Sequence, residues 1–359
     1  MAMRIAIVGC GLIGHKRAKA LPADVKLAAV ADSNHSRAQQ LAAQYPGCEV
    51  EPDWQSCVAR RDVELIIIAT VNAALAPVTL AAVRQGKHVL VEKPAARRAS
   101  ELRPAVEAAS QAGVFVKVGF NHRFHPAFRK ARELCDAGEL GPLLYVRGRY
   151  GHGGRLGYER EWRADPEIAG GGELLDQGVH LIDLSRWFLG DFVEVWGQTA
   201  TYFWKMSVED NGFMALRTAC GQTAWLHASC TEWKNLFCFE IFGRDGKLQI
   251  DGLGGSYGVE RLSFYRMRPQ MGPPETTIWE YPGEDISWSE EFRYFRDCIA
   301  AGRSPSGTLE DAVAALEVVE QIYGQSITHS VGQVEKPDHD RDSQAGKPDL
   351  RERELRKAI

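Results

Sequence analysis

The amino-acid sequence predicts an α/β fold, in which a doubly wound parallel sheet is followed by an α+β domain with a large, mostly antiparallel open sheet. Three observations predict this fold. Short apolar runs alternate with helical stretches up to about residue 118, a glycine-rich turn follows the first run, and longer β-type segments begin near residue 143. Repeated βα units form parallel sheets that bind ligands at the carboxyl ends of their strands.

The first apolar run, residues 5–8, leads directly into the pattern G-x-G-x-x-G. In such a turn Gly9 allows the tight bend, Gly11 lets the backbone approach a pyrophosphate, and Gly14 lets the new helix pack on the strand. The free N–H groups at the helix N-terminus then bind the phosphates. We therefore expect a Rossmann-type dinucleotide site that includes Gly9, Cys10, Gly11, Leu12, Ile13 and Gly14.

A second apolar run, residues 25–31, ends at Asp32, the position at which an acidic side chain binds the adenosine ribose. A carboxylate there repels a 2′-phosphate, so the sequence favours NAD over NADP. Asp32 could instead cap the next helix, although Ser33 or Asn34 could also do this. Arg37 leaves room for NADP, because an arginine near this turn can bind the extra phosphate. We assign Asp32, Ser33 and Arg37 to the adenosine end of the site.

The alternation of strands and helices continues along the first part of the chain. We expect helices over residues 35–45, 75–85 and 100–112, and strands over residues 63–69, 88–91 and 114–118. Residues that follow such strands lie at the cofactor edge of the sheet. We therefore add Thr70, Asn72, Glu92, Lys93 and Pro94 to the expected cofactor-binding residues.

The second part of the chain has a different character. Strands are expected from residue 143 and over residues 193–203, 212–219, 223–230, 238–242 and 247–250, with a hairpin at Asp245-Gly246. Helices are expected over residues 288–301 and 309–323, the latter with Thr308 as its N-cap. The sequence thus predicts an NAD(P)-binding domain (residues 1–120), an α+β domain for substrate binding and oligomerisation (121–330), and a charged, mobile tail (331–359) with a short helix near residues 350–357.

The composition is typical of a soluble globular protein. The 359 residues are 45% hydrophobic and 25% charged, and the net charge of −4 gives no reason to expect a nucleic acid or membrane partner. The first strand begins too early for a signal peptide, and no apolar run approaches the roughly 20 residues that span a bilayer. The eight cysteines lack zinc or C-x-x-C spacing. We expect a cytoplasmic protein with reduced thiols and no metal.

Two stretches carry reactive side chains. One is Glu92-Lys93-Pro94, and the other is G-G-G-E-L-L-D-Q-G-V-H-L-I-D over residues 170–183. If the second stretch is helical, Asp176 and His180 lie one turn apart on one face. An ammonium, a carboxylate and an imidazole can together handle the proton of an alcohol that is being oxidised. Each of the three side chains could also be purely structural.

These motifs resemble the Gfo/Idh/MocA family, the glucose–fructose oxidoreductase and inositol dehydrogenase group. The resemblance covers nearly all of residues 1–330 and includes the glycine motif with Asp32, Glu-Lys-Pro, residues 121–126 and G-G-x-x-x-D-x-G-x-H-x-x-D. It implies that Lys93, Asp176 and His180 form the catalytic group. It also implies a cis Lys93–Pro94 peptide and a homodimer or homotetramer formed through the open sheet.

The reaction that we expect is hydride transfer between a nicotinamide and a secondary alcohol or ketone of a sugar. In this interpretation His180 exchanges the hydroxyl proton, while Asp176 orients His180 and favours its charged form. Lys93 stabilises negative charge on the reacting oxygen.

The sequence also suggests how a substrate binds. The loop over residues 150–172 is rich in glycine and carries Arg155, Arg160 and Arg163, which favour a nucleotide sugar or a sugar acid, although the loop could simply be solvated. Trp233 offers a stacking face beside two polar side chains, although it could equally lie in the core or in an interface. The expected substrate-binding residues are Lys93, Asn121, Arg123, Arg155, Arg163, Asp176, His180, Trp233, Lys234 and Asn235.

Three alternative functions stay open at the level of the sequence. One is an inositol or polyol dehydrogenase. Another is a glycosidase that keeps NAD bound and uses transient oxidation without net redox change. The last is a dinucleotide-sensing regulator that has lost catalysis. The joint presence of Lys93, Asp176 and His180 argues against the regulator.

Overall fold

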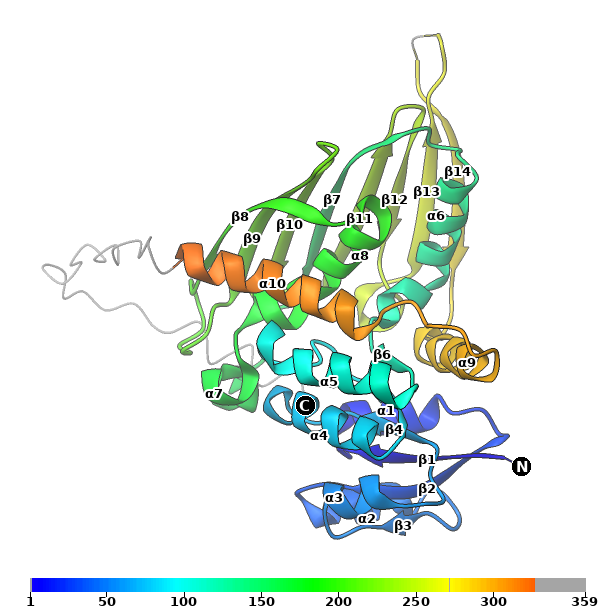
Figure 1. The fold of residues 1–359 in the computed structure, drawn as a ribbon. Coiled ribbons are helices and arrows are strands. Elements are labelled where there is room, and N and C mark those ends of the chain that lie inside the picture. Colours follow the sequence, from blue (N-terminus) through cyan, green and yellow to red (C-terminus); the bar gives the residue numbers. More distant parts are fainter. Residues whose placement is uncertain (1, 271, 327–359) are drawn as a thin grey trace, which may run out of the picture. The chain divides into compact units, whose positions relative to one another are not determined.

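The structure is a computed structural model that describes residues 2–270 and 272–326. Two sheets organise these residues, as the sequence predicted (Figure 1). The predicted tail, residues 331–359, and its short helix near residues 350–357 lie outside the described residues. The predicted boundary between residues 120 and 121 stays a prediction.

The first sheet is parallel and has six strands in the order β3-β2-β1-β4-β5-β6. The carboxyl ends of β1 and β4 therefore lie side by side at the point where the strand order reverses, which is where doubly wound sheets bind dinucleotides. The strands are β1 (Met3–Val8), β2 (Val25–Ala31), β3 (Glu49–Val50), β4 (Leu65–Ile68), β5 (His88–Val91) and β6 (Val116–Val118).

Helices cover both faces of this sheet, because alternate residues of each strand point to opposite sides. Ile5 and Ile7 of β1 pack in one cluster with α2 and α9, whereas Ala6 and Val8 pack in another with α3, α4 and α5. Burial on both sides explains why the strands read as continuous apolar runs. The helices of this part are α1 (Leu12–Lys19), α2 (His35–Ala42), α3 (Trp54–Ala59), α4 (Asn72–Arg84) and α5 (Ala99–Ala112).

The second sheet has eight strands in the order β14-β13-β12-β11-β7-β10-β9-β8. All neighbouring strands are antiparallel except β7 and β10, which are parallel, so the expected mostly antiparallel sheet is confirmed. Its strands are β7 (Leu143–Gly151), β8 (Phe192–Ala200), β9 (Asn211–Thr218), β10 (Thr223–Ser229), β11 (Leu236–Gly243), β12 (Gly246–Asp251), β13 (Glu260–Arg266) and β14 (Glu275–Tyr281).

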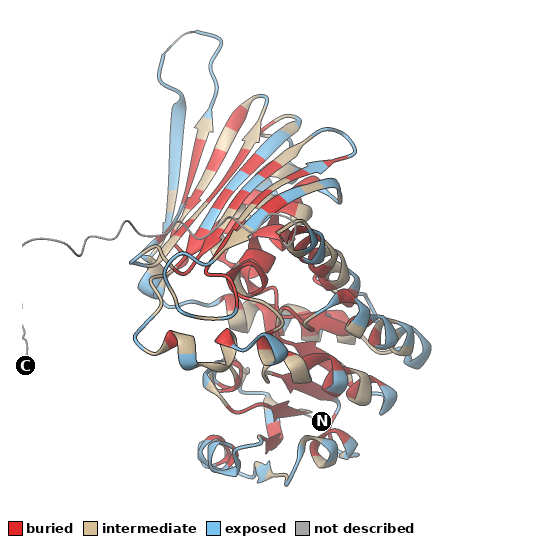
Figure 2. Ribbon diagram, turned by 90° about the vertical axis from the view of Figure 1, so that its left-hand side faces the viewer, coloured by how far each residue is buried: buried red, intermediate tan, exposed pale blue. Residues whose placement is uncertain are grey.

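One face of the large sheet is covered by helices α6, α8 and α10 (Figure 1). Along its strands, buried and exposed residues alternate (Figure 2). The opposite face carries Tyr145, Trp196 and Trp225 as exposed side chains. Large exposed apolar side chains often mark interaction surfaces. This face is therefore a suitable surface for the predicted oligomer, which stays a prediction.

The remaining helices include several that the sequence patterns did not indicate. The helices are α6 (Pro126–Asp136), α7 (Pro166–Ala169), α8 (Val179–Leu189), α9 (Ser287–Ala300) and α10 (Leu309–Ser326), with 3-10 turns at Asn121–Phe124, Tyr158–Arg160, Trp162–Ala164 and Gly255–Tyr257 and a π-helical turn at Leu174–Gly178. The sequence patterns missed β3, α3, α6, β13 and β14. The predicted N-cap of α10 is supported, because the backbone N–H of Asp311 donates to Thr308 Oγ1.

Buried charges join α9 to the first sheet. Arg17 of α1 donates to Glu92, which follows β5, at 2.6 Å and to Glu291 of α9 at 2.7 Å. Lys117 of β6 lies 3.0 Å from the other oxygen of Glu291. All four side chains are buried. This cluster couples the first helix of the chain to one of the last.

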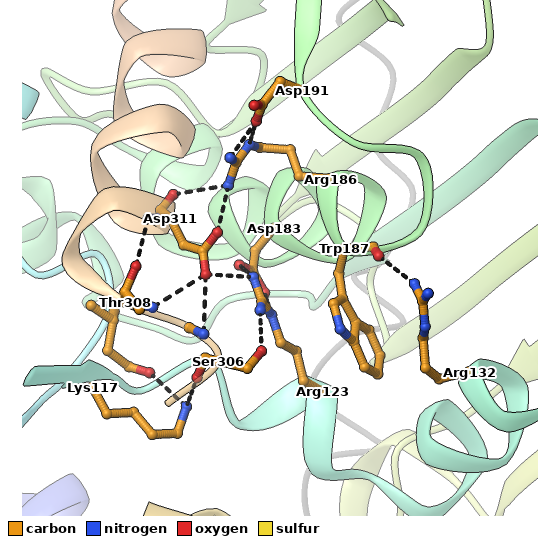
Figure 3. A network of polar contacts seen from close by, with 12 residues as sticks. Lys117, Arg123, Arg132, Asp183, Arg186, Trp187, Asp191, Ser306, Thr308 and Asp311 are labelled. Carbon is orange, nitrogen blue, oxygen red and sulfur yellow. Dashed lines mark hydrogen bonds and ion pairs between the residues drawn. The ribbon is translucent and has the colours of Figure 1, made fainter. Parts of the chain in front are cut away.

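A second ionic network links α8, α10 and the turn that carries Arg123 (Figure 3). The Arg123 guanidinium donates to both oxygens of Asp183, at 2.9 and 2.5 Å, and to the Ser306 hydroxyl at 2.7 Å. Asp311 lies 3.3 Å from the same guanidinium and also pairs with Arg186. Because Arg123 and Asp183 are buried, each charge depends on the other.

Removing one member of this pair leaves an uncompensated buried charge. We expect Asp183→Asn to lower the free energy of unfolding by about 3 kcal/mol, measured by urea denaturation. Arg103→Ala is the matched control, because it breaks the exposed Arg103–Glu317 pair and should change stability by less than about 1 kcal/mol. Equal losses in the two variants would contradict a structural role for the buried network.

Candidate active site

The glycine turn between β1 and α1 has the shape that the sequence predicted. Gly9 has a φ of +95°, and a Cβ there would lie 2.4 Å from the carbonyl oxygen of Ala69. A Cβ on Gly14 would lie 2.1 Å from the carbonyl oxygen of Gly9, so only glycine lets α1 approach the turn. Gly11, by contrast, has open space around its Cα. No side chain of residues 2–270 and 272–326 caps α1, so the first N–H groups of this helix can bind an anion.

Asp32 closes this turn from the end of β2. One carboxylate oxygen accepts the backbone N–H of Cys10 at 2.7 Å, and the other accepts that of Asn34 at 2.7 Å. Asn34 caps α2 through its own side chain, which accepts the N–H of Ser36, so Asp32 is not needed as the cap. Ser33 and Arg37 are exposed at the start of α2.

The neighbouring strand ends hold the other expected cofactor residues. Thr70 follows β4 and is half-buried, and the Asn72 side chain is buried and donates to the carbonyl of Ala169 at 2.8 Å. The Glu92 carboxylate is held in a buried ion pair with Arg17, so its place among the cofactor-binding residues stays a prediction that would rest on its main chain. The backbone at Gly9, Gly11 and Asp32 thus fits a dinucleotide, whereas the Glu92 side chain has a structural partner.

The catalytic lysine and aspartate predicted from the sequence are in direct contact. Lys93 follows β5, and its Nζ lies 2.6 Å from both the Oδ1 and the main-chain oxygen of Asp176, in the π-helical turn. The Lys93–Pro94 peptide is cis, as the resemblance implied. Although burial alone raises it, Lys93 and Arg163 hold the pKa of Asp176 well below its usual range. The carboxylate is therefore ionised and paired with Lys93.

His180, on α8, is buried against a second histidine. Its ring stacks on that of His122 with centroids 3.8 Å apart and an interplanar angle of 25°. Burial, with smaller effects of Lys93 and His125, lowers the pKa of His180 well below its usual value. At neutral pH the imidazole is therefore uncharged, and its Nδ1 has no hydrogen-bond partner among the described residues.

This geometry corrects one part of the expected mechanism. Asp176 was expected to orient His180 and favour its charged form, but no hydrogen bond joins the two side chains within the described ranges. The carboxylate binds Lys93 and lies 3.4 Å from Arg163 instead. The π-helical turn changes the spacing that an α-helix would give to residues four apart. Asp176 therefore acts on Lys93.

A pocket lies beside Asp176. Its wall includes residues from α4, the loop over residues 152–165 and the segment before α8, among them Asn72, Tyr158, Trp162, Arg163, Glu173 and Asp176. The expected substrate loop thus does form one wall of a pocket, and it contains short helices.

The arginines of this loop are already paired. Arg155 donates to Glu161 at 2.7 Å, and Arg163 lies 3.6 Å from Glu161 and 3.4 Å from Asp176. Arg160 contacts only its neighbour Glu159 among the described residues. The loop therefore presents little uncompensated positive charge.

Two expected substrate residues have buried protein partners, and their contact with a substrate stays a prediction. The guanidinium of Arg123 is buried in the network with Asp183 and Ser306 (Figure 3). Asn121 is also buried, and its amide donates to the Ser287 hydroxyl at 2.8 Å. These residues hold α9 and α10 in place. Trp233, Lys234 and Asn235 occupy the connection between β10 and β11, as predicted, and Trp233 is exposed.

The sequence also suggested that His122 lines the pocket, together with Asn121 and Arg123, whereas it gave Glu173 no role. In the structure His122 stacks on His180 and has a buried Nε2 without a hydrogen-bond partner among the described residues. Glu173 is buried beside the pocket, and burial together with the charge of Asp176 raises its pKa well above its usual value. The Glu173 Oε1 lies 3.5 Å from His152 Nε2. Their positions within the quoted motifs were the only available signal.

Comparison with known families decides the identity of the chain. The model described as "Oxidoreductase family, NAD-binding Rossmann fold" matches residues 3–120, and the "GFO/IDH/MocA C-terminal domain" matches residues 128–249. The chain belongs to the Gfo/Idh/MocA family. As a Gfo/Idh/MocA oxidoreductase, it binds NAD through its parallel sheet.

Individual relatives agree with this membership. The chain is 27% identical to inositol 2-dehydrogenase 2 of Saccharopolyspora erythraea over 355 residues, which cover 93% of this chain and 96% of that protein. It is 30% identical to levoglucosan dehydrogenase of Pseudarthrobacter phenanthrenivorans over 202 residues, or 54% of this chain and only 50% of that relative.

A solved structure shows the same fold. Levoglucosan dehydrogenase in complex with NADH and levoglucosan superposes with a TM-score of 0.83 at 24% identity, covering 91% of this chain and 97% of that one. None of the helices in the described part of this chain is long and apolar enough to cross a membrane.

The open space around Gly11 gives a test of the cofactor site. A methyl group at Gly11 meets no protein atom within 4 Å but fills the space through which a pyrophosphate approaches. We expect Gly11→Ala to weaken NADH binding about tenfold or more, measured by fluorescence titration, with an unchanged melting temperature for the cofactor-free protein. Gly324→Ala, at an exposed and equally open position on α10, is the control and should leave the affinity unchanged. Unaltered affinity in Gly11→Ala would place the cofactor elsewhere.

Proposed function

We propose that this oxidoreductase transfers a hydride between NAD and a secondary alcohol or ketone of a neutral sugar or polyol. The observation that carries the proposal is the contact between Lys93 and Asp176 beside an uncharged His180, at the strand ends that bind the dinucleotide. The relatives named as inositol and levoglucosan dehydrogenases support the same substrate class.

Each side chain has a role that follows from its contacts. His180 accepts the hydroxyl proton on its neutral imidazole during oxidation and returns it during reduction. Lys93 carries three N–H donors, of which two bind Asp176, so the third is free to stabilise charge on the reacting oxygen. Asp176 fixes the position of the Lys93 side chain through these two contacts. When NAD is bound, its nicotinamide accepts or supplies the hydride.

The charge of the pocket favours a neutral substrate. Arg163 is the one cationic side chain among the described lining residues, and it is shared between Glu161 and Asp176. The carboxyl groups of Glu173 and Asp176 belong to the same wall. A sugar acid or nucleotide sugar is the second candidate. It would have to draw Arg155 or Arg163 away from Glu161 to form a bidentate pair.

A substrate panel tests the function directly. We expect the purified protein with NAD to produce NADH absorbance with at least one neutral sugar, anhydrosugar or inositol, and more slowly with the matching sugar acids and nucleotide sugars. Faster turnover of the charged substrates would favour the second candidate. If no substrate of the panel changes the NADH absorbance, product analysis by mass spectrometry distinguishes a redox-neutral glycosidase from a sensing protein. Either result contradicts the proposal.

The role of His180 is tested with the best substrate of that panel. Because a positioned general base contributes about 10²–10⁴ in rate, we expect His180→Asn to lower kcat by that factor. The affinity for NADH should stay within about threefold of the wild type, because His180 belongs to α8 and not to the glycine turn. Parallel losses in kcat and in NADH affinity would instead indicate a structural histidine.

A further inference from the structure

Three large aromatic side chains stand in solvent near the pocket. Trp233 is 64% exposed, Tyr202 is 67% exposed and Phe203 is 55% exposed. We call these three residues the aromatic platform. They come from two separate connections, β8–β9 and β10–β11. Exposed apolar groups that gather from different segments mark a binding surface more often than scattered ones do.

The loop that carries Tyr202 and Phe203 is held by a buried carboxylate. Asp210 accepts the backbone N–H groups of Tyr202, Phe203 and Trp204 at 2.9, 2.7 and 3.0 Å. The indole N–H of Trp204 donates to the carbonyl of Cys230 at 2.9 Å. Charge-assisted bonds of this kind fix a loop strongly. These hydrogen bonds therefore hold the backbone of Tyr202 and Phe203 in place while their rings remain exposed to solvent.

Trp233 is fixed in a conformation that a large side chain rarely adopts. Its φ is +60°, in the left-handed region, and its ring meets that of Phe203 edge-on with centroids 4.6 Å apart. A residue keeps such a strained backbone conformation only when the surrounding structure holds it there. Residues of this kind are often found at ligand-binding sites. The Trp233 ring thus lies against Phe203 while 64% of the residue is exposed to solvent.

The platform continues the wall of the pocket. Phe203 contacts Trp204 with ring centroids 5.1 Å apart, and Trp204 contacts Tyr158 at 5.7 Å. Tyr158 lines the pocket together with Asp176. Met206, from the same loop as Phe203, lines it too. An unbroken series of rings thus leads from the pocket to solvent.

We propose that the aromatic platform is a subsite for the second sugar ring of a glycoside or disaccharide, whose first ring reacts at Lys93 and His180. Aromatic faces pack against the C–H faces of sugars, and the neighbouring Lys234 and Asn235 can donate hydrogen bonds to hydroxyl groups. A second protein surface would have to desolvate the exposed Lys234 ammonium without an identified partner. This inference rests on the proposed function and narrows its substrate class.

The test compares disaccharides with their own monosaccharides. Protein loaded with NADH, in which an alcohol binds without being oxidised, is titrated calorimetrically with glucose, galactose and mannose and with cellobiose, maltose, lactose and mannobiose. We expect at least one disaccharide to bind roughly 3- to 10-fold more tightly than its monosaccharide. Trp233→Ala should abolish this preference and Trp233→Phe should keep most of it. Phe203→Ala is a second variant, in case Trp233→Ala does not fold.

The outcomes separate this inference from the proposed function. Equal binding of every disaccharide and its monosaccharide, or a preference that survives Trp233→Ala and Phe203→Ala, overturns the subsite. Loss of oligomers in those variants by analytical ultracentrifugation would assign the platform to a second copy and also overturns it. The proposed function fails on a different readout, the absence of turnover with every monosaccharide and polyol.

Discussion

The ion pair between Lys93 and Asp176 is the contact on which the candidate site depends. It joins the end of a strand in the parallel sheet to the π-helical turn in front of α8, so that side chains from two parts of the chain act at one place. Two oxygens of Asp176 hold the ammonium group of Lys93 in place. Less conformational entropy of the lysine side chain is therefore lost when a substrate binds. Because Asp176 binds Lys93, His180 has no carboxylate partner in the part of the chain that the structure describes, and burial keeps the imidazole neutral.

Charge at the site is therefore divided between two environments. The ionised pair is partly exposed, whereas His180 and Glu173 are buried and hold their neutral forms. Enzymes commonly use differences in burial to keep one group neutral and its neighbour charged. The two groups can then act as acid and base. Here this arrangement follows from the π-helical turn, which brings Asp176 to Lys93.

The sequence was sufficient for the parts of the fold and site that depend on local pattern. The glycine turn and the alternation of strands and helices in the first part of the chain follow from periodicity and from backbone demands at Gly9 and Gly14. The strand order of the second sheet does not follow from these patterns, which missed β13 and β14. The sequence was also not sufficient where partners come from distant segments. Glu92 and Arg123 look like site residues in sequence, but Arg17 and Asp183 bind them, and the π-helical turn that separates Asp176 from His180 has no sequence signature.

The buried cluster of Arg17, Lys117, Glu92 and Glu291 has a consequence for how the protein is made. Two cations belong to the first third of the chain, and one of their two acidic partners belongs to α9, near residue 291. Until α9 leaves the ribosome, Lys117 lacks the carboxylate of Glu291, and a buried unpaired charge is strongly disfavoured. The nucleotide-binding part therefore reaches its final form late in synthesis, although its strands emerge first.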